Sequence, residues 1–470
     1  ILLVISVIIM PPDFSRHRDL WIGAGLWLLT FGLSFLGCIN ASTYISPYIE
    51  LIHLAGIICF MLTATLILSA RPDAKKILAA ALAIGLVATL LLGLEQYFHG
   101  FKDTMEFIEQ RESKTGVELA GDFKVKVGDI RIFSTFASSN ALGGFILLTF
   151  PLVLAIIHKF TAKVEPVKIS RPLFMVLFGI LALFVFGYTR SRASYLSLIA
   201  MMSFCIILFP VNKKLKIATC ILVPLAIIGG TVYISTTERS FASMRVRIDY
   251  ILRSGEMMLA HPFAGTGWGD FFHDYMKIKT YPNSEAPHMP HNIIMAFASQ
   301  TGIFGGLAVT AAILWPLFVL WKKIRRERLL KAIFTLDGAI FCGLLAFFIH
   351  CMFDVHLQIP ASMSAALLLS MMATVPSDRQ ECIPGKTKTW LKLLTIAGCL
   401  TLSSLTFYHS RQILRYQEVF ERLLDLCDRR TKTPEAFMRI SPEKVTSLLR
   451  QCVELLPQSP FPWFTAGDFM

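Results

Sequence analysis

The chain has 470 residues, of which 54% are hydrophobic and only 16% are charged. A soluble globular protein usually has about a quarter charged residues, so this composition, with a mean hydropathy of +0.60, excludes an ordinary soluble enzyme. The net charge of +13 does not indicate a nucleic-acid partner, because much of it lies in short loops that we expect to face anionic membrane lipids.

Apolar runs of about 20 residues recur along the chain, and each is long enough to cross the hydrocarbon core of a bilayer. They predict an all-α, polytopic membrane protein with about 12 transmembrane helices. The expected spans are residues 1–10, 20–39, 51–69, 77–97, 134–157, 172–189, 193–210, 217–235, 292–321, 332–353, 361–376 and 389–408. The sequence opens at Ile1 inside an apolar run, and we therefore expect it to be a fragment that lacks its natural start.

The loops between the spans alternate in charge, and this alternation predicts their orientation. The loops at 71–76, 158–171, 211–216, 322–331 and 377–388 are basic, whereas 40–50 and 354–360 contain no lysine or arginine. Short basic loops stay in the cytoplasm. The segments 98–133, 188–193, 236–291 and 409–470 are then expected on the outer side of the membrane.

We expect two parts: a transmembrane domain at 1–408, with a large external loop at 236–291, and an external helical tail at 409–470. In the tail, Val445, Leu448, Leu449, Val453 and Leu456 have the spacing of an amphipathic helix. The stretch resembles a junction between tetratricopeptide-type repeats, which are protein-binding modules, although a simple helical hairpin explains it nearly as well. The tail could thus offer a surface to a protein partner.

Two external segments break the charge rule. Arg190 and Arg192 lie in the turn at 188–193, and Arg245 and Arg247 lie in the external loop on a predicted helix. Guanidinium groups bind phosphate through two hydrogen bonds and remain charged, so these arginines are candidates for binding an anionic ligand. Ordinary solvation, with pairing to nearby acidic residues, is the alternative. Arg245 and Arg247 lean to opposite faces of their helix, so only one of them can point inward.

The stretch PHMPHN at 287–292 precedes the longest apolar run. Its two prolines favour a helix that begins near His291. The free N–H groups at such a helix start would bind a phosphate, and the helix dipole would keep the imidazole neutral enough to accept a proton. His291 is therefore a candidate general base, with Asn292 and His288 as candidate substrate contacts. Gly302 and Gly305, further along the run, would allow a kink or close helix packing.

Other polar groups give weaker signals. The turn Gly265-Thr-Gly-Trp-Gly269 lacks the preceding strand and the full spacing of a dinucleotide loop, and we expect only a tight turn. Asp337, His350, Asp354 and His356 lie in or beside spans, where a packing role explains them at least as well as function does. The ten cysteines form no CxxC or His/Cys cluster, so we expect neither a disulfide framework nor a metal site.

Taken in chain order, four stretches resemble one family. His291-Asn292, followed after nine residues by Gly302-Ile-Phe-Gly305, matches the H[N/S/Q]-x9-G-x-x-G pattern of the O-antigen ligase and polymerase superfamily. RIFSTFASSNALGGFILL (131–148), TRSRASYLSL (189–198) and MRVRIDYILRSGEMMLAHPFAGTGWGDF (244–271) are similar to three further family segments. Ser134 and the pair Ser138-Ser139 depart from the pattern, and Tyr250 or Ile251 stands where tryptophan is usual. The resemblance covers residues 131–375.

The resemblance implies a metal-independent glycosyltransferase, without a cofactor, in the bacterial cytoplasmic (inner) membrane. Such enzymes move a glycan from an undecaprenyl-diphosphate carrier to an acceptor hydroxyl at the periplasmic face. The acceptor is the lipid A core in ligases of lipopolysaccharide biosynthesis, another repeat unit in polymerases, and a protein side chain in O-oligosaccharyltransferases. Arg192 and Arg247 match the family's functional arginines and are expected to bind the diphosphate, with Arg190 and Arg245 as neighbours, while His291 acts as the base.

A different class of function is also open, because some relatives have been described as inorganic-carbon transporters and a polytopic protein with buried polar residues suits transport. We find no inverted repeat in the sequence, and the large basic external loop favours an external catalytic site instead.

Overall fold

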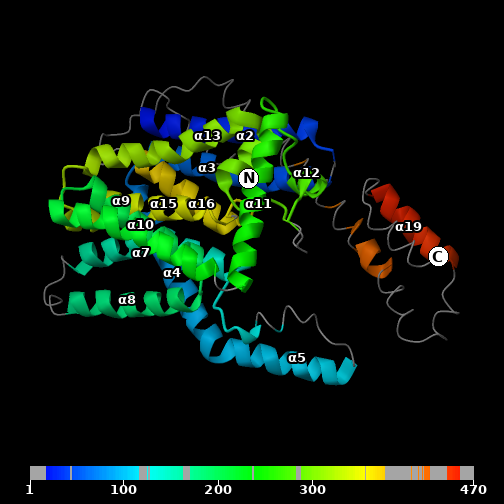
Figure 1. Cartoon of the computed structure of the whole chain (residues 1–470), viewed down its shortest axis with the longest axis horizontal. Coiled ribbons are helices and arrows are strands. Elements are labelled where there is room, and N and C mark those ends of the chain that lie inside the picture. The colour runs from blue at the N-terminus through cyan, green and yellow to red at the C-terminus, as the bar shows by residue number, and fades with distance from the viewer. Residues whose placement is uncertain are drawn as a thin grey trace.

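The computed structural model describes residues 17–42, 45–115, 124, 127–161, 170–235, 238–281, 287–354, 356–375 and 442–455, with short pieces between 404 and 423. The described part is helical and contains no strand. Its helices are α2 (Arg18–Gly37), η1 (Cys38–Asn40), α3 (Ile45–Ala70), α4 (Ala74–Glu95), η2 (Gln96–Gly100), α5 (Phe101–Thr115), α7 (Ser139–Thr161), α8 (Ser170–Tyr188), α9 (Arg192–Leu208), α10 (Lys213–Ser235), α11 (Glu238–Ala260), α12 (Phe271–Ile278), α13 (Ile293–Ile324), α14 (Leu329–Ile333), α15 (Leu336–His350), α16 (Pro360–Thr374) and α19 (Pro442–Leu455). Figure 1 shows the long helices side by side in a bundle, from which α5 projects.

Five stretches of helix are long and apolar enough to cross a membrane: Arg18–Asn40, Pro47–Ala70, Ala74–Ser113, Ser139–Lys159 and Ile293–Ile324. The apolar helices α8, α9, α15 and α16 are shorter. These helices confirm a helical membrane protein, and each lies where a span is expected from the sequence. The expected spans 1–10 and, apart from Ser404, 389–408 lie outside the described residues, so the total of 12 spans stays a prediction.

Two expected spans begin later than the apolar pattern indicates. The span at 134–157 begins as α7 at Ser139, because residues 129–138 form a loop in which Gln96 Oε1 accepts hydrogen bonds from the N–H groups of Phe133 (3.0 Å) and Ser134 (2.8 Å). The span at 332–353 is divided into α14 and α15, because the Thr335 hydroxyl caps α15 by accepting from the Gly338 N–H at 3.0 Å. In both places a polar contact outweighs the hydrophobic pattern.

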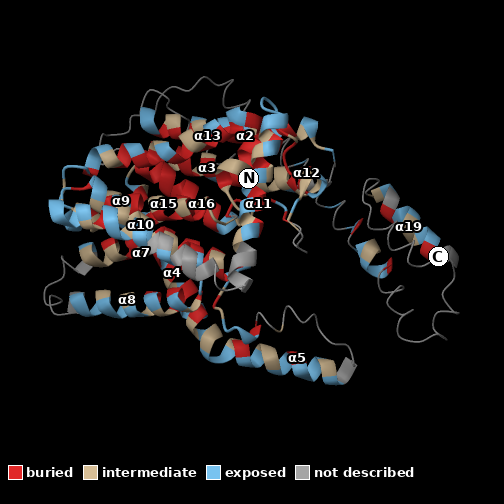
Figure 2. Cartoon of the chain, viewed as in Figure 1, coloured by how far each residue is buried: buried red, intermediate tan, exposed pale blue. Residues whose placement is uncertain are grey.

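The centre of the bundle is formed by α15 and α16, whose residues are mostly buried (Figure 2). Helices that are apolar on all sides are typical of positions surrounded by other helices. α8 lies at the rim and differs from them. Its residues Leu173, Leu177, Ile180 and Leu183 follow one face and are between 54% and 64% exposed. A row of exposed large aliphatic side chains is expected where a helix faces lipid rather than water.

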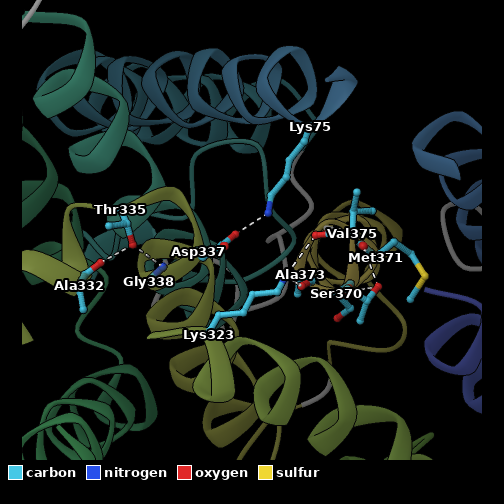
Figure 3. A network of polar contacts seen from close by, with 11 residues as sticks. Lys75, Lys323, Ala332, Thr335, Asp337, Gly338, Ser370, Met371, Ala373 and Val375 are labelled. Atoms are coloured by element: carbon cyan, nitrogen blue, oxygen red, sulfur yellow. Dashed lines mark hydrogen bonds and ion pairs between the residues drawn. The ribbon is translucent and has the colours of Figure 1, made fainter. Parts of the chain in front are cut away.

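At one end of the bundle, α9 and α13 begin and α15 ends; we call it the His291 end. At the opposite end a buried ion pair joins Lys75 of α4 to Asp337 of α15, as Figure 3 shows. Lys323 of α13 donates hydrogen bonds of 3.1 Å to the carbonyl groups of Ala373 and Val375, at the C-terminus of α16. Of the two roles that the sequence leaves open for Asp337, packing or function, this ion pair supports packing.

Candidate active site

The start of α13 holds His291 in place. Asn292 is the N-cap, and its side-chain oxygen accepts from the Met295 N–H at 3.0 Å. Its amide nitrogen donates to the Met352 carbonyl at 3.2 Å, and the Ile293 N–H donates to the Cys351 carbonyl at 2.9 Å. Two of the N–H groups that the sequence assigns to a phosphate are thus already used within the protein. These bonds instead fasten the helix start to the loop that follows α15.

A third contact between the same segments reaches the imidazole itself. His291 Nδ1 lies 3.2 Å from Oδ1 of Asp354, and the His291 ring stacks on Tyr250 of α11 with ring centroids 5.7 Å apart. The His291 backbone has a φ of 28°, in the left-handed region that few side chains adopt. Such strained residues collect at functional sites. His291 is thus fixed on two sides, and its side chain keeps an exposed fraction of 32%.

The charge of Asp354 decides which imidazole nitrogen is free. Burial by itself raises the pKa of the Asp354 carboxyl, but the hydrogen bond from His291 and the charges of His291, His356 and His350 lower it more, so that its pKa lies below the ordinary value. Asp354 is therefore ionised at neutral pH and accepts a hydrogen bond from Nδ1–H of His291. Nε2 then carries the lone pair, and no described residue bonds it. From the sequence, a packing role explains Asp354 at least as well as a functional one, whereas its contact with His291 makes it part of the candidate site.

Gly302 interrupts α13 three turns after His291. Its φ of 77° and ψ of −177° are not helical, and a Cβ atom there would lie 2.6 Å from the Phe263 carbonyl carbon and from the Pro262 oxygen. The glycine-rich turn after α11 fits into this break. The Ile303 N–H donates to the Pro262 carbonyl at 2.8 Å, and the Gly269 N–H donates to Gln300 Oε1 at 2.8 Å. Gly302 thus makes the predicted kink, and the turn is a docking element rather than a nucleotide loop.

The second glycine of the motif has a different role. A Cβ atom on Gly305 would lie 1.7 Å from the Thr301 hydroxyl oxygen, one turn earlier in the same helix. That hydroxyl donates to the Phe297 carbonyl at 2.7 Å. Gly305 therefore makes room for a contact within α13, and not for the approach of another helix.

Three arginines gather where α9 begins. Arg190 and Arg192 flank Ser191, the N-cap of α9, and are exposed. Arg131 donates to the Thr189 carbonyl at 3.2 Å. Burial lowers the pKa of Arg131 below its ordinary value; Asp129 opposes this effect, while the charges of Arg192 and Arg190 lower the pKa further. In the part of the chain that is described, neither Arg190 nor Arg192 forms an ion pair with a carboxylate. Arg131 is missed by the sequence analysis, although it opens one of the family-like stretches.

The arginine cluster and His291 belong to the same end of the bundle. Ser194, two residues after Arg192, lies with its hydroxyl 3.0 Å from His350 Nε2, and His350 precedes Asp354 by one helical turn. On α11, Arg247 is half-buried and Arg245 is exposed, so Arg247 is the one of the two that faces inward. It lies three residues before Tyr250, on the same helix face, and close enough to His350 for their charges to interact.

His288 is less closely tied to this group. Its side chain is exposed, its ring centroid lies 6.3 Å from that of Phe272, and its charge interacts with that of Glu50 on α3. Glu50 in turn accepts a hydrogen bond of 2.8 Å from Gln358, in the loop between α15 and α16. An acidic group in an apolar helix is a functional candidate, and the sequence analysis does not single it out.

Three cavities in the described part of the chain differ in size and polarity. An apolar groove of about 1070 Å³ lies between α7, α8, α9 and α14, and a polar cleft of about 610 Å³ lies over the glycine-rich turn. A much smaller cavity, of about 10 Å³, is lined by Asn292, Asp354 and His356 among others. No cluster of His, Cys, Asp or Glu with the arrangement of a metal site occurs among the described residues.

Residues 177–310 match the family model described as O-Antigen ligase. The matched segment runs from α8 to the middle of α13 and contains Arg190, Arg192, Arg247 and His291; Arg131 and Asp354 lie outside it. No curated protein sequence matches the chain at a significant level.

Proposed function

We propose that this chain, whose residues 177–310 identify it as a member of the O-antigen ligase superfamily, transfers a glycan from an undecaprenyl-diphosphate carrier to an acceptor hydroxyl at the outer face of the bacterial inner membrane. One observation carries the proposal: His291 is held by an ionised Asp354 at the end of the bundle where Arg190 and Arg192 also lie, and neither of these arginines forms an ion pair within the described residues.

The imidazole is suited to act as a general base. Because the Asp354 carboxylate accepts a hydrogen bond from Nδ1–H, the Nε2 lone pair can accept the proton of an attacking hydroxyl, and the carboxylate then stabilises the imidazolium that forms. Tyr250 limits the rotation of the ring by stacking on it. Asp354 and Tyr250 are positioning residues in this scheme, and His291 is the catalytic residue.

The arginines are suited to stabilise the negative charge of the leaving diphosphate. When the bond between the sugar and the diphosphate breaks, both bonding electrons stay with the diphosphate, and the added negative charge is stabilised by guanidinium groups placed in advance. Arg192 and Arg247 are the proposed ligands, and Arg131 and Arg190 increase the positive potential around them. The hydroxyl oxygen attacks the anomeric carbon in one displacement, which inverts its configuration.

The carrier lipid also needs a place for its prenyl chain. The apolar groove of about 1070 Å³ is lined by Leu198 and Met202 of α9, which begins at Arg192. A lipid with its diphosphate at the start of α9 could therefore lay its hydrocarbon tail along the same helix.

The test uses the full chain in lipid nanodiscs with an undecaprenyl-diphosphate-linked fluorescent oligosaccharide. Lipid A core, a second lipid-linked repeat unit and a serine-containing protein are offered as separate acceptors, which distinguishes a ligase, a polymerase and an oligosaccharyltransferase. We expect transfer to one of them, its loss in His291→Ala, and its retention in His261→Ala, a control at an exposed histidine. Absence of transfer to all three acceptors, or bicarbonate flux in proteoliposomes that His291→Ala leaves intact, would refute the proposal.

A further inference from the structure

One face of α11 carries a row of large aliphatic side chains, which we call the α11 row. Its members recur at helical spacing and are between 40% and 74% exposed: Ile248, Ile251, Leu252 and Leu259. The opposite face packs against the rest of the protein through Val246, Tyr250 and Met257, each at most 4% exposed. A helix in an aqueous loop turns polar residues outward, so the α11 row requires a different environment.

Charged side chains flank the α11 row on both sides. The helical period places Arg245 and Glu256 along one edge, and the Glu256 carboxylate pairs with Arg253 of the same helix. Arg247, four residues before Ile251, lies along the other edge. An apolar face between charged edges is the pattern of a helix that lies in the surface of a membrane.

The α11 row continues the apolar outer surface of the bundle. Phe263, in the turn after α11, stacks on Phe304 of α13 with ring centroids 6.2 Å apart, and both rings are more than half exposed. α13 is long and apolar enough to cross a membrane, and Phe304 belongs to its exposed face. That face also carries Ile303, Leu307, Leu314 and Phe318. At its other end, α11 follows α10 after two residues and contacts it, so both ends of α11 are tied to apolar helices.

The direction of α11 differs from that of the long helices. Figure 1 shows α11 running steeply across the direction of α13 and its neighbours. It contacts α13, and Tyr250 stacks on His291 just before α13 begins, with ring centroids 5.7 Å apart. α11 therefore lies at the His291 end, where the bundle meets one surface of the membrane.

We propose that the α11 row lies among the lipids of that membrane surface, with its side chains in the boundary between headgroups and acyl chains. Lipid fits the row better than a protein partner, because Phe263 and Phe304 join the row to the exposed apolar face of α13. A protein on the row would have to end where this surface continues onto a membrane-spanning helix. The lipid contact itself does not depend on glycan transfer.

The contact has a consequence for the candidate active site. Arg247 is half-buried at the edge of the α11 row, and Tyr250 holds the His291 ring from the buried face of the same helix. A helix anchored at the headgroup boundary keeps both residues at the level where membrane lipids carry their phosphates. This consequence rests on the proposed function, since it assumes that Arg247 binds the diphosphate of the carrier.

Fluorescence quenching tests the contact without an activity assay. The full chain is placed in lipid nanodiscs, one copy in each disc, with a dansyl amino acid at position 252 or, as the matched control, at position 276. Met276 is an exposed apolar residue of α12, in the same loop but outside the α11 row. Two quenchers are compared: iodide, which stays in the water, and lipids with a doxyl group near the glycerol.

We expect the doxyl lipids to quench the label at position 252 and iodide to leave most of its fluorescence, with the reverse at position 276. Iodide quenching of both labels alike would show that the row lies in water. Protection of the label at position 252 from both quenchers would show that protein covers it. Either result refutes the lipid contact. Position 259 repeats the test if a label at position 252 prevents folding.

Transfer assays in the same nanodiscs test the link to the site. The double variant Leu252→Glu and Leu259→Glu puts charge into the lipid contact, which displaces α11 together with Arg247. We expect KM of the lipid-linked donor to rise about 10-fold, and Met276→Glu to keep the wild-type KM. Leu252→Gln, a milder change, replaces the double variant if that variant fails to fold.

The outcomes separate this inference from the proposed function. An unchanged KM in a folded double variant would show that the lipid contact does not position Arg247. An inactive wild type would refute the proposed function, whereas the quenching result needs no activity and decides the lipid contact alone.

Discussion

Replacing Asp354 by asparagine tests the pair at the centre of the site with the smallest change of shape. The amide fills nearly the same volume as the carboxylate but carries no charge. It can also turn its N–H₂ group toward Nδ1 of His291, which then becomes an acceptor. The proton moves to Nε2, and the imidazole loses the lone pair that the reaction needs.

The size of the effect follows from the geometry. The atoms His291 Nδ1 and Asp354 Oδ1 are 3.2 Å apart. At this distance the Coulomb attraction between an imidazolium and a carboxylate is about 5 kcal/mol at an effective dielectric constant near 20 and about 1 kcal/mol in bulk water. The side chains are 32% and 12% exposed, which places the pair between these limits. A loss of about 2–3 kcal/mol in the transition state corresponds to roughly a 100-fold decrease in kcat.

The assay compares Asp354→Asn with Asp274→Asn in nanodiscs under saturating donor. Asp274 also pairs with a cation, Lys277 at 2.8 Å, but Lys277 is 63% exposed, and exposed pairs contribute little. Asp274→Asn should therefore keep kcat within about 2-fold of wild type. If Asp354→Asn is folded and retains more than about a third of the wild-type kcat, the carboxylate does not support a base at His291 and the reasoning fails.

Gly302→Ala should destabilise the chain by about 1–3 kcal/mol, because the φ of Gly302 is 77° and a Cβ atom there would meet the docked turn. Thermal unfolding in detergent measures this loss of stability. The control Gly25→Ala should leave the stability unchanged, because Gly25 has open space around it. Arg192→Gln should raise KM of the donor about 10-fold or more through the loss of a charge-assisted hydrogen bond, and an unchanged KM contradicts its role. Met202→Trp should also raise KM of the donor by filling the apolar groove; if a short-chain donor is affected as much as the full-length one, the groove does not hold the tail. The pKa of Asp354 lies below its ordinary value, so the extra stability of wild type over Asp354→Asn should not decrease from pH 7 to about pH 4 and should be lost only below that. A decline between pH 7 and pH 5 in denaturant titrations would contradict the pairing.

The position of His291 could be predicted from the sequence, whereas its partner could not. Two prolines and an asparagine cap are local signals for the start of α13, and the structure begins this helix at Ile293. Asp354 lies 63 residues away in a loop after another helix, and no periodic pattern links the two. The same holds for Arg131, which meets Arg190 and Arg192 only because the loop before α7 folds back on the end of α8, where the Ile132 N–H donates to the Tyr188 carbonyl.

Short or polar elements were harder to predict than the long apolar ones. α12 has only eight residues, too few for a helical period to stand out, and α5 is a polar helix that continues from α4 without a break signal. The kink at Gly302 was one of two expected roles for the motif. The docking of the turn into that kink depends on contacts with Gln300 and Ile303 that only the folded chain brings together.

The ion pair at the far end of the bundle has a consequence for biosynthesis. Lys75 and Asp337 are separated by 262 positions in the chain. Chains are synthesised at about 5–20 residues per second, so Asp337 is added to the chain roughly 13 to 50 seconds after Lys75. During that time water or lipid head groups have to hold the ammonium group of Lys75, which is later buried at 7% exposure. The ion pair at this end therefore forms late in assembly, and Asp337 fixes α4 against α15 only after the later helices have been inserted.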